Sequence, residues 1–282
     1  MRGGPAIPFF IVAITTSIIH AQTASSARAY VERGNERFAQ KDIKGALDDF
    51  NIAITFDPDY ASAYYNRGRV LLSNGFPDDA IADFTKAISI DPRLARAYDG
   101  RANALLGKGQ YDQAIADFDQ LLQIAARYAP GYVNRGSVRQ LKGDLNGAIS
   151  DFNRAIDINP RLAQAYNNRG AVLLAMSEFK RAITDFSRAL RLDPHLTAAY
   201  NGRGAAYLEL GDLDIAISDF NRAIQSDLKY AVAYLNRGIA LWLKGRTTEA
   251  DGDFKSGLEL NPNLKSLIEE RKKEMGSRFS IQ

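Results

Sequence analysis

Apolar and polar positions recur along this chain with a period of 34 residues. Small or large apolar residues occupy the fourth and eighth positions of each period and the eleventh of five periods, and again the twentieth, twenty-fourth and twenty-seventh. Both sets have the spacing of one face of an α-helix, so each period predicts two helices. Seven consecutive periods fit without insertion or deletion, over residues 27–60, 61–94, 95–128, 129–162, 163–196, 197–230 and 231–264.

Four positions of the period are nearly constant and explain how the two helices can pack. The fourth is always Tyr, the eighth is Gly or Ala, the twentieth is always Ala and the twenty-fourth is always Phe. Small residues let two helix backbones approach closely, and the aromatic rings fill the space beside them. A Gly near the fifteenth position marks the turn between the helices, and Pro at the thirty-second usually ends the pair.

This pattern resembles the tetratricopeptide repeat family over nearly the whole chain after its N-terminal segment. In the second repeat the family motif is matched by Tyr64, Gly68, Ala80, Phe84, Ala87 and Pro92. The resemblance implies an all-α, right-handed superhelical solenoid of seven helix-turn-helix repeats, whose concave groove is lined by the first helix of each pair. Stacked repeats bury a face that one repeat alone cannot bury.

Some repeats depart from the pattern. The third has Leu121 in place of Ala and Ala126 in place of Pro, and Pro130-Gly131 follow. The junction between the third and fourth repeats is therefore where we expect altered stacking, with local repacking as the alternative. Arg37 and Arg139 stand at the eleventh position, where the family has a large apolar residue.

The ends of the chain have different characters. Residues 1–21 combine Arg2, an apolar run from Phe9 to Ile19 and a terminal Ala21, which is the layout of a secretory signal peptide. A short linker, 22–26, would follow it, and 265–282 would form a capping helix and tail. We expect a periplasmic or secreted protein with no membrane span after cleavage; the alternative is membrane anchoring by an uncleaved N-terminal segment.

Two charged columns accompany the core positions. Arg precedes the small residue of the first helix and Asp precedes the core Phe in every repeat. We interpret them as a structural ladder of ion pairs, within or between repeats, rather than a basic stripe for an acidic partner. The ladder comprises Arg67, Arg101, Arg135, Arg169 and Arg203 with Asp83, Asp117, Asp151, Asp185 and Asp219.

The sixth position suggests a partner-binding role. It belongs to the side of the first helix that lines the groove in this family, and an Asn there could pair with a peptide backbone through donor and acceptor. The alternative is a solvated Asn that merely suits the helix. The family's carboxylate clamp fits poorly, because Val31 and Gly100 stand where it needs cations. The Asn column consists of Asn66, Asn134, Asn168 and Asn236.

The predicted groove changes character along its length. Tyr65 contributes to a wetter surface in the N-terminal half. Toward the C-terminus the groove positions are apolar and include the only Trp of the chain, an aromatic anchor typical of binding hot spots. Either a partner or the C-terminal helix must cover this patch, which comprises Leu235, Ile239, Trp242 and Leu243; Leu208 also belongs to the predicted groove.

Composition limits the classes of function that we expect for the chain. A net charge of +3 gives no reason to expect nucleic acid, and the chain has no Cys and only two His. No catalytic or cofactor motif occurs, so we expect no enzyme, metal or cofactor. The sequence predicts a non-catalytic scaffold that binds a protein or extended peptide; the alternatives are a self-associating solenoid, such as a homodimer formed through the C-terminal patch, and a glycan or cell-wall binder.

Overall fold

A computed structural model describes residues 25–279 of the chain. A helix covers residues 25–39, and no strand occurs in the described range, so the all-α prediction is confirmed there. The following helices are α2 (Ile43–Phe56), α3 (Ala61–Ser73), α4 (Pro77–Ile90), α5 (Ala95–Gly107), α6 (Tyr111–Ile124), α7 (Ala129–Leu141), α8 (Leu145–Ile158), α9 (Ala163–Ala175), α10 (Phe179–Leu192), α11 (Thr197–Leu210), α12 (Leu213–Ser226), α13 (Ala231–Leu243) and α14 (Thr247–Leu260). A 3-10 turn, η1 (Pro262–Leu264), leads into the last helix, α15 (Lys265–Arg278).

Consecutive helices pack in pairs, as the repeat pattern predicts. The closest contacts join α3 to α4, α5 to α6, α9 to α10, α11 to α12 and α13 to α14. The turn within a pair reverses the chain through a residue with positive φ, which is Gly75, Gly109, Gly143, Gly211 or Gly245 in five repeats. Glycine adopts this left-handed conformation without steric cost. Lys41 and Ser177 adopt the same conformation in the first and fifth repeats.

The invariant Phe is the centre of each repeat's core. Phe84 is fully buried, and its ring lies so close to Gly68 that a Cβ there would be 2.9 Å from it. The same ring faces Gly100 of the following repeat, where a Cβ would be 2.7 Å away. One aromatic side chain therefore fills the space between its own first helix and the next repeat, and the small residues on both sides make the approach possible.

The chain forms two compact units that divide between Gly131 and Tyr132, inside α7. The division falls at the junction where the third and fourth repeats depart from the pattern. Within each unit, neighbouring first helices touch one another, as α3 does α5 and α11 does α9 and α13. The first helices thus form one face of each unit, which we call the first-helix face, and the second helices form the other.

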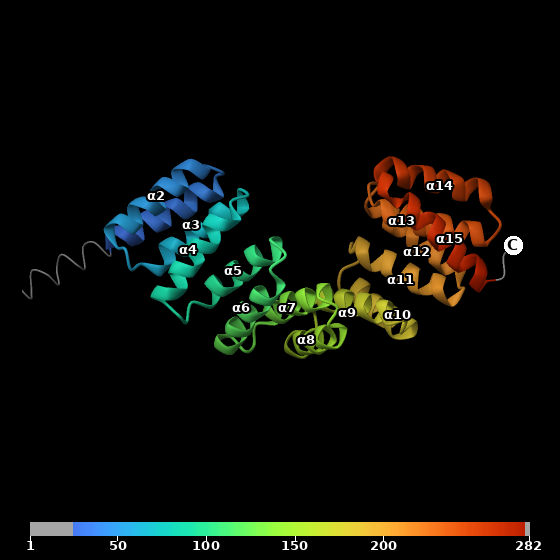
Figure 1. The fold of residues 1–282 in the computed structure, drawn as a ribbon, viewed down its shortest axis with the longest axis horizontal. Coiled ribbons are helices and arrows are strands. Elements are labelled where there is room, and N and C mark those ends of the chain that lie inside the picture. Colours follow the sequence, from blue (N-terminus) through green and yellow to red (C-terminus); the bar gives the residue numbers. More distant parts are fainter. Residues whose placement is uncertain (1–24, 280–282) are drawn as a thin grey trace, which may run out of the picture. The chain divides into compact units, whose positions relative to one another are not determined.

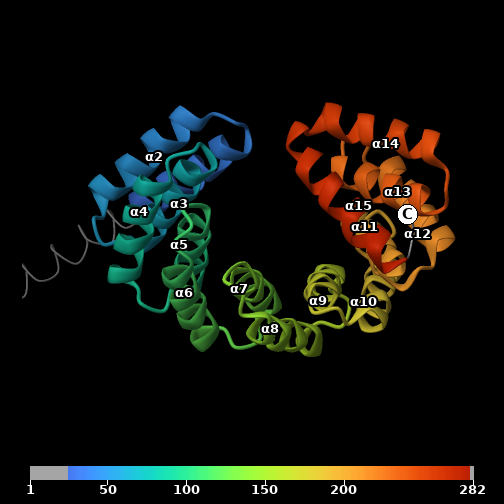
Figure 2. The same ribbon diagram turned by 45° about the vertical axis from the view of Figure 1, so that its right-hand side comes forward.

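The C-terminal helix does not continue the stack as another first helix would. After η1, α15 turns back and makes its main contacts with α13. Figures 1 and 2 both show α15 lying across α13 and α11 within the second unit. The predicted capping helix therefore exists, and it lies on the first-helix face. No helix in the range 25–279 is both long and apolar enough to cross a membrane. The predicted signal peptide, 1–21, lies outside the described residues.

Candidate partner-binding face

The Arg and Asp columns pair within repeats. Arg67 Nε donates to Asp83 Oδ2 at 2.8 Å, and its Nη2 donates to Asp83 Oδ1 at 2.6 Å. This two-bond geometry clips the first helix of a repeat to its own second helix. The equivalent pairs are Arg33–Asp49, Arg101–Asp117, Arg135–Asp151, Arg169–Asp185, Arg203–Asp219 and Arg237–Asp253.

The remaining guanidinium nitrogen reaches the preceding repeat. Arg67 Nη1 donates to Asn51 Oδ1 at 2.6 Å, and Arg101 Nη1 donates to Thr85 Oγ1 at 3.0 Å. Arg169, Arg203 and Arg237 make the same backward contact, to Asn153, Ser187 and Asn221. Each of these arginines therefore joins three helices, and its carboxylate partner is buried. The hydrogen bonds that these guanidinium groups donate to the Asp carboxylates raise the pKa of Arg67, Arg101, Arg169, Arg203 and Arg237.

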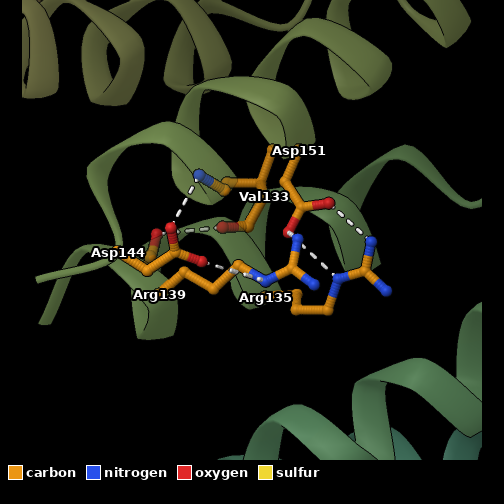
Figure 3. Close-up of polar contacts among 7 residues, drawn as sticks. Val133, Arg135, Arg139, Asp144 and Asp151 are labelled. Atoms are coloured by element: carbon orange, nitrogen blue, oxygen red, sulfur yellow. Dashed lines mark hydrogen bonds and ion pairs between the residues drawn. The ribbon is translucent and has the colours of Figure 1, made fainter. Parts of the chain in front are cut away.

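Arg139 enters this ladder as a second cation, which Figure 3 shows. Its Nη1 lies 2.8 Å from Asp151 Oδ2, while Arg135 Nη2 lies 2.5 Å from Oδ1 of the same carboxylate. Its Nε also approaches Asp144 at 4.0 Å. Arg37 repeats the arrangement in the first repeat, with Nη1 at 3.1 Å from Asp49 Oδ1. Arg37 and Arg139, the two departures from the pattern at the eleventh position, thus each add a second cation beside a buried Asp of the ladder.

The side chains of the Asn column are partly or fully buried, and Asn66 does not lie on an open groove surface. Asn66 is only 6% exposed, and its Nδ2 donates to the Ser62 carbonyl at 2.8 Å. Asn168 Nδ2 donates to Ser137 Oγ, and Asn236 Nδ2 donates to Asn201 Oδ1, both on the preceding first helix. Asn134 also has a contact of its own. The amides of Asn66, Asn168 and Asn236 thus connect first helices to their own backbone or to each other.

The reason for this placement is the core Phe of the preceding repeat. The sixth position is Gly in the third and sixth repeats, and a Cβ at Gly202 would lie 2.4 Å from the Phe186 ring. The position therefore faces the neighbouring repeat, and the polar amides are at the border between the core and the surface.

The apolar C-terminal patch is not exposed. Leu208, Leu235 and Ile239 are buried, and α15 adds Ile268 and Met275 to the same core. Trp242 is half-buried beside them, with Lys272 Nζ at 5.7 Å from its ring centroid. Of the two coverings that the sequence left open, the structure has the C-terminal helix over these side chains. Their contact with a partner stays a prediction. The chain's own last helix covers the surface that self-association was expected to use.

A different cluster occupies the first-helix face of the first unit. Tyr65 of α3 is flanked by two guanidinium groups, Arg96 at 4.7 Å and Arg69 at 5.7 Å from its ring centroid. Arg96 Nη2 also donates to Ser62 Oγ at 2.6 Å, and Arg69 Nη1 donates to Asn66 Oδ1 at 3.2 Å. Both arginines are exposed, and neither forms an ion pair with a carboxylate in the described range. We call Tyr65, Arg69 and Arg96 the arginine–tyrosine cluster.

Tyr128 and Asp99 lie close to the cluster. Tyr128 is 41% exposed, and desolvation together with the charge of Asp99 raises its pKa. The sequence predicted Tyr65 as a groove residue but not the approach of Arg69 and Arg96 to its ring. The two cations come from neighbouring first helices, so their common approach to one ring depends on how the repeats stack.

Other site types find no support in the described residues. Within 25–279, no group of three or more His, Asp or Glu side chains could hold a metal ion. His195 lies in the turn before α11, where its backbone N–H donates to Asp193.

Three family models match the chain. A "TPR repeat" model matches residues 34–75 and 139–177. One "Tetratricopeptide repeat" model matches residues 163–196, and another matches residues 65–130 and 201–263. No curated protein matches the chain significantly.

Many solved structures share the fold. A tetratricopeptide repeat protein from Parabacteroides merdae superposes with a TM-score of 0.69 at 19% identity, covering 89% of this chain and 99% of that one. YrrB, described as a TPR protein with an unusual peptide-binding site, gives 0.54 at 23% identity, covering 65% and 95%. PilW, a type IV pilus biogenesis factor, gives 0.65 at 18% identity, covering 72% and 94%. At these identities the likeness concerns the fold alone.

Proposed function

Because the chain belongs to the tetratricopeptide repeat family, we propose that it is a non-catalytic scaffold that binds an extended segment of another protein on its first-helix face. The repeats bury their Phe, Ala and Gly positions among themselves, which leaves the exposed side chains of the first helices available for contact. Scaffolds of this kind bind through a surface built by several repeats. YrrB, which shares the fold, is described as peptide-binding.

The observation that supports this proposal is the arginine–tyrosine cluster. Two exposed guanidinium groups lie over one aromatic ring without a carboxylate partner in the described range. A guanidinium can donate two parallel hydrogen bonds to a carboxylate. Stacking on Tyr65 restricts both side chains before a partner arrives, which reduces the entropy lost on binding. We propose that the segment carries acidic side chains that dock between Arg69 and Arg96.

The proposed location is outside the cytoplasm. It rests on the signal-peptide pattern of residues 1–21, and the AYxNRG and AIxDF style of the repeats suggests a bacterial source and hence the periplasm. Mass spectrometry of the protein purified from the envelope fraction checks this point, since cleavage after Ala21 predicts a mature chain that begins at Gln22.

Binding can be tested with labelled extended peptides that carry paired Glu, beside matched peptides with Gln in their place. Fluorescence anisotropy should show that the Glu peptides bind more tightly than the Gln peptides. The Arg69→Gln/Arg96→Gln variant should bind the Glu peptides with about tenfold lower affinity. Arg93→Gln, an exposed arginine whose side chain has no polar contact within residues 25–279, is the control and should change nothing. Added salt should weaken the Glu peptides selectively.

A second variant separates this mechanism from backbone pairing. Changing Asn66, Asn134, Asn168 and Asn236 to Ala removes the amides that the sequence pattern predicts to hold a peptide backbone. If this variant binds neither the Glu nor the Gln peptides while the arginine variant still binds both, the peptide is held through its backbone and not through its acidic side chains. Equal affinity for both peptide types in every variant would overturn the acidic segment as the ligand.

A further inference from the structure

The last helix occupies the part of the second unit where a partner would bind. Leu235 and Ile239 of α13 stand at the same repeat positions as Tyr65 and Arg69 of α3. In the first unit this face carries the exposed arginine–tyrosine cluster, whereas in the second unit α15 covers it (Figure 2). The chain thus supplies its own helix to a face that equivalent repeats leave open.

The covering contact has a defined chemistry. Ile268 and Met275, seven residues apart on α15, are buried against Leu208, Leu235 and Ile239. Beside this apolar strip, Arg271 Nη2 lies 2.6 Å from Glu209 Oε1 and Arg278 Nη1 lies 2.6 Å from Glu209 Oε2. Glu209 belongs to α11, and its side chain is only 12% exposed. One carboxylate therefore holds two arginines that are also seven residues apart.

Several features make α15 a weakly held helix. No side chain caps its N-terminus, and Gly276 lies in its last turn. Its larger apolar residues in the core are only Ile268 and Met275, while Leu267 is 39% exposed. Helices with few buried contacts detach at lower free energy than the core of a domain.

The face is also larger than the helix that covers it. A recess of about 400 Å³ remains beside α15. Leu174, Phe179, Val232 and Leu267 line it together with Glu209 and Arg271. Apolar surface thus stays open next to the carboxylate that holds α15.

We infer that the face formed by α11 and α13 is a binding site for a basic amphipathic helix, and that α15 is its occupant supplied by the chain itself. The partner helix presents an apolar strip to Leu235 and Ile239 and two arginines to Glu209. It binds by displacing α15, so the chain's own helix lowers the apparent affinity in proportion to the fraction of time it is docked. This site lies in the second unit and is independent of the acidic segment proposed for the first.

The test uses a labelled synthetic peptide of residues 265–282 as the partner helix. Met275→Asp in the full chain places a charge in the core and should release α15 while leaving the face intact. We expect the peptide to bind this variant at least about tenfold more tightly than the unaltered chain. Adding Glu209→Gln should weaken that binding by a similar factor, and Arg69→Gln/Arg96→Gln should not affect it.

Trp242 reports on the release directly, because it is the only Trp and Lys272 of α15 lies over its ring. Its emission should change in Met275→Asp and return when the peptide is added. Arg271→Gln/Arg278→Gln keeps the apolar contacts, so it tests release without the risk of unfolding; it should also raise peptide binding.

Three results would overturn the inference. One is that neither variant binds the peptide better than the unaltered chain. Another is that Met275→Asp unfolds the second unit while the arginine variant leaves Trp242 emission unchanged, which would make α15 a permanent part of the core. The third is a dimer of the unaltered chain at high concentration that Met275→Asp dissolves, because α15 of a second copy would then be the occupant.

Discussion

Arg139 donates to the Asp151 carboxylate at 2.8 Å and shares it with Arg135. The same position holds a buried leucine in three other repeats, Leu105, Leu173 and Leu241. The methylene groups of Arg139 occupy the space that leucine fills in those repeats, and its guanidinium group reaches the buried carboxylate. The fourth repeat therefore has two cations for one anion.

The two arginines should be able to replace each other in part. Arg135→Ala leaves Asp151 with Arg139, and Arg139→Leu leaves it with Arg135. The double variant leaves the carboxylate buried without either cation, which costs about 3 to 5 kcal/mol. We expect its loss of unfolding free energy in urea to exceed the sum of the single losses by about 1 kcal/mol. Arg154→Ala, at an exposed position of α8, is the control; strict additivity would contradict the shared role.

A second expectation concerns Gly147, in the first turn of α8. Asp144 caps this helix by accepting from the Gly147 N–H at 2.9 Å, and a Cβ on Gly147 would lie only 2.0 Å from Asp144 Oδ2. Gly147→Ala should therefore lose the cap and cost about 1 kcal/mol. In an Asp144→Ala background the same change should stabilise the helix, because alanine is the better helix former.

Gly252 provides the matched comparison, since it lies inside α14 with nothing within 4 Å of an added Cβ. Gly252→Ala should raise the free energy of unfolding by about 0.5 to 1 kcal/mol. Equal destabilisation at both sites would mean that the Asp144 carboxylate does not determine the choice of glycine.

The turn of the fifth repeat is strained relative to the five turns that have glycine. Ser177 has a φ of 60°, whereas five other repeats have Gly at the equivalent point. Removing the Cβ relieves a steric cost of about 1 to 2 kcal/mol, part of which is offset by the greater freedom of glycine when unfolded. Ser177→Gly should thus stabilise the chain by about 0.5 to 1 kcal/mol in urea titrations.

The opposite change controls for the turn itself. Gly143 has a φ of 83° and open space where a Cβ would stand, so only conformation opposes Gly143→Ala. It should be destabilising by about 1 kcal/mol. Stabilisation by this change, or destabilisation by Ser177→Gly, would contradict the assignment of strain.

The repeat pattern predicted the helix pairs because it is local and recurs seven times. Tyr64, Gly68 and Phe84 each lie where the periodicity places them, and the Phe ring fills the space that the Gly opens. The Arg67–Asp83 pair was also visible as two matched columns. The sequence did not show that the pair lies within a single repeat, because a side chain at that edge can reach carboxylates on either neighbouring helix.

The errors arose where tertiary contacts decide exposure. Asn66 was expected on an open surface, but the stacking of its repeat against the preceding one buries it. For Ile239 the sequence left open whether a partner or the C-terminal helix covers it. The helix α15 turns back over it, and no local signal in residues 265–278 distinguishes that course from stacking on α14. The arginine–tyrosine cluster was missed for a similar reason, because Arg69 and Arg96 belong to different repeats.

Acid should weaken the first repeat through Asp49. Hydrogen bonds from Arg33 lower the pKa of this carboxyl, and burial opposes them only in part. Because the pKa is lower in the folded chain than in the unfolded one, the ion pair stabilises fully above the unfolded value of about 3.9. That stabilisation is lost as the pH falls through the folded pKa. Asp49→Asn should therefore destabilise the chain at pH near 7, and the difference from the unaltered chain should shrink below about pH 3.5.

Hydrogen exchange of α2, followed with pH, measures this difference locally. Asp48→Asn is the matched control, because Asp48 is the exposed neighbour of Asp49 on the same helix and its side chain has no hydrogen bond or ion pair among the described residues. It should track the unaltered chain at every pH. If Asp49→Asn kept a constant deficit down to low pH, the loss would come from packing of the side chain, and the charge of Asp49 would contribute nothing to the acid sensitivity of the repeat.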